Sequence, residues 1–266
     1  MDQTGGNGLL KPLSYRRKRL ARGFCAGLLL LAAGLLPPLA HAGGETVTIG
    51  NFSAAPAGAG HPTDWEPLTF DNIARHTDYR LVQNAGTTVV RAQAADSASG
   101  LIRRIRIDPR EYPVIEWRWN ALDLPQGNDP RTKAGDDFAA RIYVAFEYDA
   151  ARAGALDRLT YEAARLIYGD YPPAGSLNYV WDSSLPEGTR FASPYTERNR
   201  VIVVESGSAR LGEWVSERRN VLEDYRNAFG KEPPMIEGVA IMTDADNTGG
   251  RTAALYGDIV FRRLAD

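Results

Sequence analysis

The clearest alternation of apolar and polar positions in the chain runs from Phe138 to Tyr148. Successive side chains of a strand point to opposite faces, so this segment predicts a strand with one apolar face. The other face carries Arg141, Tyr143 and Glu147, separated by small alanines. Either this face is a solvated surface with an Arg–Glu pair, or the alanines leave room for a ligand. The pattern marks a candidate site without naming its chemistry.

A second alternating segment, residues 114–120, places Trp117 and Trp119 on one face and Arg118 on the other. The tryptophan face is either core or a platform for a sugar ring. Arg118 faces away from it, which makes it a candidate contact on the same open surface as Arg141. Other short runs predict strands at residues 45–52, 79–83, 87–92, 101–107, 177–181, 201–205, 238–242 and 254–262.

Two segments have helical spacing. Apolar residues between positions 156 and 167 recur every three or four residues, and Gly169 follows them. Asn220 and Glu223 form a capping pair for a helix over residues 221–229, which Gly230 ends. Many short strands, two short helical insertions and no strand–helix–strand rhythm predict an all-β sandwich. Residues 43–266 are expected to form a single domain.

The first 42 residues have the pattern of an export signal. A basic stretch ending at Arg22 precedes a short apolar run from Gly23 to Leu36, and Ala40-His41-Ala42 follows as a cleavage site. The run is too short to span a bilayer comfortably, so no membrane span is expected after its removal. The expected location is the periplasm or the cell exterior, reached by general secretion or the twin-arginine route.

Removing residues 1–42 changes the charge of the chain. The segment holds six Lys or Arg and one Asp, so 25 basic and 32 acidic residues remain, with a net charge of −7. Nucleic acid is therefore not an expected partner, because binding it requires a basic face. The remaining chain has no cysteine and only His61 and His76, which makes disulfides, a zinc site and a nucleophilic triad poor hypotheses.

Polar residues near predicted strand ends extend the candidate site. Asp136 and Asp137 precede the strand that carries Arg141, and Asn178 and Trp181 lie in another predicted strand. Together with Arg118 and the alternating face, these give the ligand-binding set Arg118, Asp136, Asp137, Arg141, Tyr143, Glu147, Asn178 and Trp181. Paired carboxylates for catalysis would come from Asp136, Asp137, Glu147, Glu205 and Asp244, although no sequence gives their separations.

A glycine-ended loop suggests a cation. Asp244 and Asp246 lie in this loop and Asp258 in the last strand, and the three are the candidate ligands of a structural calcium ion. The loop lacks the length and the closing glutamate of an EF-hand. A turn in which Asp and Asn side chains bond their own backbone is the alternative.

Several long motifs occur together: TKAGDDFAARIYVAFEY, LNYVW, VIVVESG, LGEWVSERRNV, AIMTDADNTGG and LYGDIVF. In these motifs the chain, over nearly all of residues 45–263, resembles the domain of unknown function 3047 family. This resemblance implies a secreted bacterial protein but no particular activity. A weaker similarity of architecture, carried by Gly257-Asp258-Ile259 in the last strand, is to jelly-roll carbohydrate-binding modules and implies a jelly-roll-like sandwich.

Three functions are compatible with these features. The first is binding of a cell-envelope glycan or other small polar ligand on a concave sheet face. The second is a carboxylate-dependent enzyme that cleaves glycans, and the third is an accessory protein of the cell envelope that contacts other proteins. A concave face lined by Arg141, Tyr143 and Glu147 would favour the first two.

Overall fold

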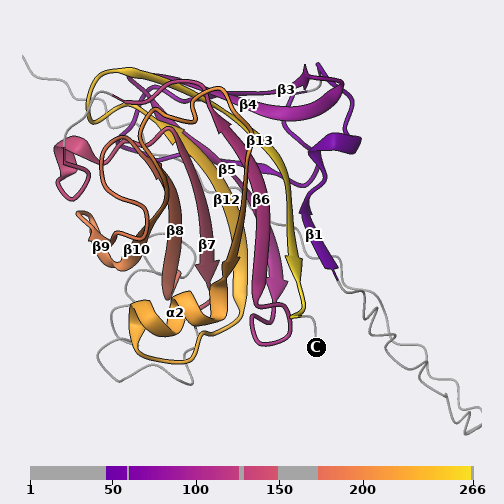
Figure 1. Ribbon diagram of the computed structural model, residues 1–266, viewed down its shortest axis with the longest axis vertical. Helices are drawn as coiled ribbons and strands as arrows, with labels where there is room; N and C mark the ends of the chain where they lie inside the picture. Colours follow the sequence, from indigo (N-terminus) through magenta and orange to yellow (C-terminus); the bar gives the residue numbers. More distant parts are fainter. Residues whose placement is uncertain (1–45, 59, 126–128, 149–172, 265–266) are drawn as a thin grey trace, which may run out of the picture. The chain divides into compact units, whose positions relative to one another are not determined.

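Two β-sheets stacked face to face form the protein in a computed structural model, which describes residues 46–58, 60–125, 129–148 and 173–264 (Figure 1). The six-stranded sheet contains β1 (Thr46–Gly50), β3 (Asp78–Asn84), β4 (Thr87–Ala95), β6 (Val114–Ala121), β11 (Val215–Asn220) and β13 (Arg251–Arg262). Its order is β11-β6-β13-β4-β3, and β1 pairs with β13 beside this path.

The seven-stranded sheet carries the predicted site. It contains β2 (Glu66–Leu68), β5 (Ala98–Ile107), β7 (Ala140–Phe146), β8 (Gly175–Asp182), β9 (Arg190–Ser193), β10 (Thr196–Ser206) and β12 (Ile236–Asp244). Its order is β2-β5-β12-β7-β8-β10-β9. All neighbours in both sheets are antiparallel except β8 and β10, which are parallel. The predicted all-β, jelly-roll-like sandwich is confirmed.

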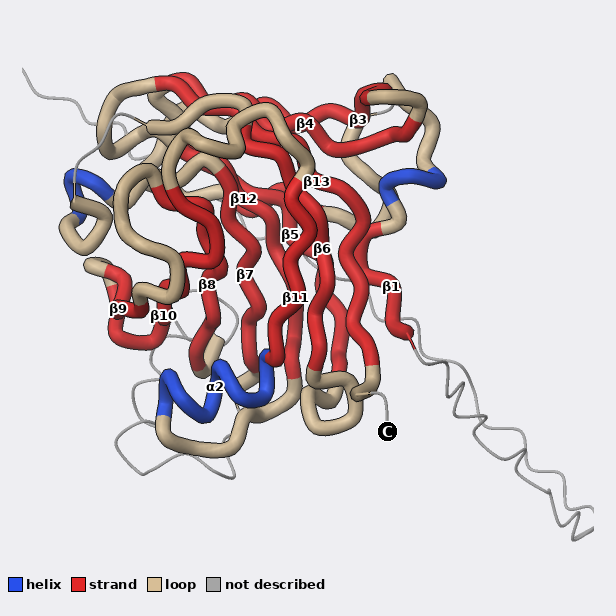
Figure 2. The backbone as a smooth tube through the Cα atoms, viewed as in Figure 1, coloured by secondary structure: helices blue, strands red, loops and turns tan. Residues whose placement is uncertain are grey.

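Few helical residues accompany the strands (Figure 2). Helix α2 (Val221–Phe229) begins and ends as the sequence predicts. The Asn220 side chain accepts a hydrogen bond from the Glu223 N–H, and Gly230 adopts the left-handed conformation that ends the helix. Single turns η1 (Phe52–Ala54) and η2 (Lys133–Gly135) complete the helical part of the described chain. The helix expected between residues 156 and 167 lies outside the described residues.

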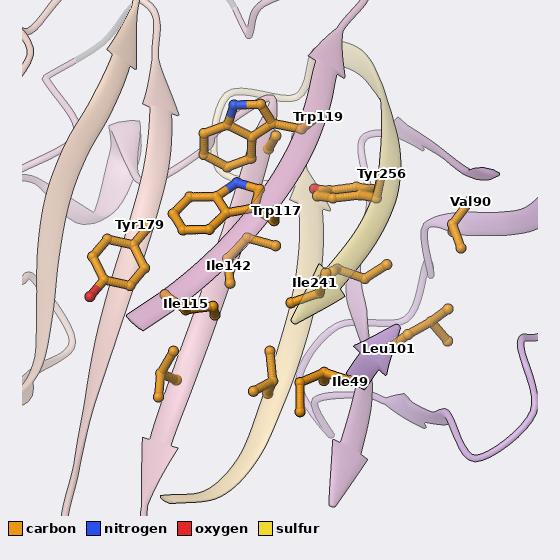
Figure 3. Packing of buried hydrophobic residues seen from close by; sticks show 14 of the residues in the cluster. Ile49, Val90, Leu101, Ile115, Trp117, Trp119, Ile142, Tyr179, Ile241 and Tyr256 are labelled. Carbon is orange, nitrogen blue, oxygen red and sulfur yellow. The ribbon is translucent and has the colours of Figure 1, made fainter. Parts of the chain in front are cut away.

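The core lies between the sheets and is rich in aromatic rings (Figure 3). The Trp117 and Trp119 rings pack edge to face with centroids 5.3 Å apart, and Trp119 lies 6.2 Å from Trp181 across the sandwich. The tryptophan face of β6 is therefore core rather than a sugar platform. Trp181, predicted to bind ligand, is completely buried in the same cluster, so that prediction is wrong: its side chain points inward with its alternate neighbour Tyr179.

Tyr256 on β13 joins the two sheets near the predicted site. Its hydroxyl donates to the Met242 carbonyl at 2.5 Å and lies 2.8 Å from the Thr243 hydroxyl, both on β12. These bonds fix β12 under the six-stranded sheet. Separately, no helix among the described residues is long and apolar enough to cross a membrane.

Candidate functional site

The candidate site lies on the outer face of the seven-stranded sheet, the side turned away from the other sheet. On β7 the apolar side chains of Ile142, Val144 and Phe146 belong to the core. Arg141 and Tyr143 alternate with them and therefore point to the outer face. The sequence predicted this division of β7 correctly.

The Arg141 side chain is buried on that face and bonded to neighbouring residues. It is only 2% exposed, and its Nε donates to Asp244 Oδ1 at 2.8 Å while Nη2 bonds the second oxygen of the same carboxylate. Nη2 also donates to the Asp136 carbonyl, and Nη1 lies 3.5 Å from the Asp136 carboxylate. The expected exposure of Arg141 is thus wrong. The cause is strand pairing, because Met242 of β12 lies opposite Arg141 and brings Asp244, two residues later, to the guanidinium.

A group of carboxylates surrounds this arginine. Oxygens of Asp137, Asp244 and Asp246 lie within 4.8 Å of one another. Burial raises the pKa of Asp244 well above its ordinary range, and Arg141 opposes this shift; burial also raises the pKa of Asp136. Arg141 supplies positive charge that the crowded carboxylates require. Asp137 instead accepts hydrogen bonds from the backbone N–H groups of Asn247 and Thr248, in the loop after β12.

The predicted calcium ligands are only partly brought together. Asp244 and Asp246 share the group, but Asp258 accepts the Ser53 backbone N–H at 2.9 Å and its hydroxyl at 2.5 Å. Asp258 thus fastens β13 to η1, and Asp137 takes its place in the group. The sequence does not reveal that Asp137, which precedes β7, lies beside the loop after β12 in the folded protein. The place of Asp137 in the group could therefore not be predicted. A calcium ion at Asp244 and Asp246 stays a prediction, and Asp258 is not part of the group.

Tyr143 and Asn178 form the polar centre of the outer face. They lie directly opposite each other on β7 and β8. The Arg141 guanidinium donates to the Tyr143 hydroxyl at 3.1 Å and fixes its position, while burial raises the Tyr143 pKa to about 12. Asn178 is completely buried, and neither its side-chain nitrogen nor its oxygen has a hydrogen-bond partner in the described part of the chain. The side-chain amide of Asn178 therefore leaves its donor nitrogen and its acceptor oxygen unused beside Tyr143.

Small residues border this pair, and the sequence analysis passed over most of them. Ala240 of β12 lies opposite Tyr143, while Ser176, Gly238 and Ala145 form the next row of the same face. An added Cβ at Gly238 would come within 3.1 Å of the Arg103 carbonyl. The available signal was the alternation of small residues along β12, which becomes informative only once β12 is known to lie beside β7.

Two other predicted residues are placed apart from this centre. Glu147, just after β7, accepts two hydrogen bonds from Arg106 at 3.0 and 2.9 Å, so it forms the Arg–Glu pair expected of a solvated surface, with a different arginine. Arg118 lies on β6 of the other sheet, 4.7 Å from the centre of the Trp214 ring. Its expected place on the open face is wrong, because β6 and β7 belong to different sheets.

The fold and this face define a class of protein, a jelly-roll-like sandwich with a polar centre on one outer sheet face. The chain belongs to the family described as protein of unknown function (DUF3047), whose model matches residues 63–260. The resemblance in the sequence motifs is thereby confirmed. No curated protein matches the chain.

Solved structures with a similar architecture include carbohydrate-active proteins. The family 11 carbohydrate-binding module of the cellulase Lic26A-Cel5E from Clostridium thermocellum is 8% identical, with 83% of this chain and 96% of that chain covered and a TM-score of 0.41. A cellulase derived from Cel12A of Rhodothermus marinus is 12% identical, with 81% and 99% covered and a TM-score of 0.36. At such identities and scores, no ligand or activity follows for this chain.

Proposed function

We propose that this protein binds a hydroxyl-rich, glycan-like ligand on the outer face of the seven-stranded sheet, with Asn178 and Tyr143 as its contacts. The observation that carries the proposal is the buried, unpaired side-chain amide of Asn178. A buried amide without partners costs free energy, so its presence calls for a partner from outside the described chain.

Neighbouring hydroxyl groups of a saccharide match this centre. One hydroxyl can accept from the amide nitrogen of Asn178 while the next donates to its oxygen, and the Tyr143 hydroxyl both donates and accepts. The small side chains of Ala145, Ser176 and Ala240 support a flat ligand beside Tyr143. Arg141 acts here by holding the Tyr143 hydroxyl rather than by touching the ligand.

Replacing Asn178 by leucine should separate binding from stability. Leucine has a similar volume without polar atoms, so Asn178→Leu should raise the free energy of unfolding by about 1 kcal/mol and abolish ligand binding. Binding is measured on an array of cell-envelope saccharides and then by calorimetry with the best hit. Stability is measured by urea unfolding.

Asn120→Leu is the matched control. Asn120 is also buried but lies in the six-stranded sheet, where its side chain donates to the Gly212 carbonyl at 2.8 Å. Its replacement should destabilise the protein and leave saccharide binding unchanged. Full saccharide binding by Asn178→Leu would refute the proposed contact.

We infer further that the protein is exported and that residues 1–42 are removed to leave Gly43 at the amino terminus. The succession of basic residues, a short apolar run and Ala40-His41-Ala42 supports this inference. N-terminal sequencing of protein recovered from the periplasm or the medium is expected to begin at Gly43. Material beginning at Met1 would overturn it.

A further inference from the structure

The outer face of the six-stranded sheet carries two arginines, Arg91 and Arg118. On β4 Arg91 alternates with the core residues Val90 and Ala92 and therefore points outward. On β6 Arg118 lies between the two core tryptophans and points outward for the same reason. Strands β4 and β6 lie on either side of β13, about 10 Å apart. The two arginines thus flank the middle strand of this face.

Neither guanidinium group has an acceptor in the part of the chain that the structure describes. Most of the described arginines pair with a carboxylate, as Arg80 does with Asp78 at 2.8 Å. Arg91 and Arg118 are half-buried, yet their side chains form no ion pair and no hydrogen bond with a described residue. The Nε atom of Arg91 is itself buried and unpaired there. Donors withdrawn from water without an acceptor cost free energy, so these two call for a partner from outside the described chain.

A third arginine adds to the positive charge beside Arg91. Arg80 of β3 lies directly opposite Arg91 in the pairing of β3 with β4. Like charges at directly opposite positions destabilise a sheet. The carboxylate of Asp78 accepts from Arg80 Nε at 3.2 and 2.8 Å, and Asp78 itself lies opposite Gln93. The charge of Arg91 is therefore left uncompensated, and an anion bound beside it would relieve the repulsion.

Packing rather than ion pairing holds Arg118. Its guanidinium carbon lies 4.7 Å from the centre of the Trp214 ring, and Trp214 Nε1 donates to Asn84 Oδ1 at 3.0 Å. A Cβ added at Gly257 of β13 would lie 2.5 Å from Arg118 Cγ and Nε, so a side chain there would displace the arginine. The stem of Arg118 therefore extends over β13, the strand that separates it from Arg91. A guanidinium stacked on a ring keeps the N–H groups at its edge available for a ligand.

We propose that Arg91 and Arg118 form a second binding site, and that its ligand is an acidic saccharide that presents a carboxylate or a phosphate group. Both groups offer the paired oxygens that fit the guanidinium fork. Leu255 lies opposite Arg91 on β13 and gives this site an apolar floor beside Gly257. The arginines repel a cation, and a neutral ligand would leave their charge uncompensated.

This site is separate from the one proposed above. Arg91 and Arg118 lie on the outer face of the six-stranded sheet, whereas Asn178 and Tyr143 lie on the outer face of the other sheet. The argument for it therefore does not depend on glycan binding at Asn178.

The test titrates the protein with glucuronate, glucose 6-phosphate and glucose. NMR follows the Nε–H resonances of Arg91 and Arg118 and the indole N–H resonance of Trp214, which Trp214→Phe identifies. We expect saturable shifts of these resonances with at least one of the two acidic probes and none with glucose. The ratio of the two affinities shows whether the site prefers a carboxylate or a phosphate.

Arg91→Gln and Arg118→Gln should each weaken this binding about tenfold or more, because hydrogen bonds to a charged group are lost. Arg226→Gln is the matched control, since it removes the same charge from an exposed ion pair between Arg226 of α2 and Glu232. It should leave the affinity unchanged. The indole resonances of Trp117 and Trp119 in the core report whether each variant is folded.

Three outcomes would overturn the proposal. One is the absence of any shift with both acidic probes. Another is an equal response to glucose, which would assign the binding to hydroxyl groups. The last is unchanged affinity in folded Arg91→Gln and Arg118→Gln, or an equal loss in Arg226→Gln. The Asn178→Leu variant should retain this binding, so failure at Asn178 and failure of this site are distinguishable.

Discussion

Replacing Arg141 by alanine is expected to lower the free energy of unfolding by about 3–5 kcal/mol. Arg141 is buried and bonds both oxygens of Asp244, the Asp136 carbonyl and the Tyr143 hydroxyl. Without it, several buried carboxylates lose their compensating charge, which costs far more than the loss of one contact. Urea unfolding of the wild type and the variant measures the difference.

Arg106→Ala is the matched control, because it removes an arginine from an ion pair on the same sheet. Its partner Glu147 is bonded at 2.9 Å, but the Arg106 side chain is mostly exposed, so the cost should stay below about 1 kcal/mol. The cost of Arg141→Ala should also be smaller near pH 5 than near pH 8, because protonated carboxylates need no partner. Equal costs for the two arginines would show that the buried network contributes little.

Part of this site could be predicted from the sequence and part could not. Alternation along β7 placed Arg141 and Tyr143 opposite the core side chains, because alternation is a property of one strand. Whether Arg141 is exposed depends on Asp244 at the end of the neighbouring strand β12, which is 103 residues away in the chain. Contacts between distant segments also decide where Arg118 and Asp258 lie. The alternation within one strand therefore did not reveal that Arg118 belongs to the other sheet or that Asp258 lies outside the carboxylate group.

Strand β11 was not predicted from the sequence for a different reason. Its sequence VSERRN has only one apolar side chain, so it offers no apolar face by which a strand is recognised. Glu217 lies opposite the core residue Trp117 of β6 and therefore points inward all the same. An inward-pointing acid with a raised pKa thus lies in a segment whose composition is typical of a loop.

Lowering the pH should stabilise the protein through Glu217. Burial raises the pKa of this side chain from its ordinary value of 4.5 to about 7, and repulsion from Glu205 adds to the shift. A hydrogen bond from Trp119 and attraction from Arg210 oppose it. Arg219, on the same strand, and Asp224 of α2 complete the charged surroundings. The folded protein therefore binds a proton at Glu217 that the unfolded chain has already lost in this pH range. The contribution of Glu217 to stability is greatest below about pH 4.5, falls as the pH rises to about 7 and is constant above it.

The variant Glu217→Gln isolates this contribution, because glutamine resembles the protonated acid and does not titrate. It should exceed the wild type by about 1–2 kcal/mol near pH 8, after allowance for solvent screening of a half-buried group, and should equal it near pH 4.5. Asp244 and Asp136 shift in the same direction but are present in both proteins, so they cancel in the comparison. Glu197→Gln, an exposed change, should differ from the wild type equally at both pH values. Urea unfolding at the two pH values measures the free energy of unfolding of each protein. If the difference between Glu217→Gln and the wild type does not change with pH, Glu217 stays ionised in the folded protein and the prediction is wrong.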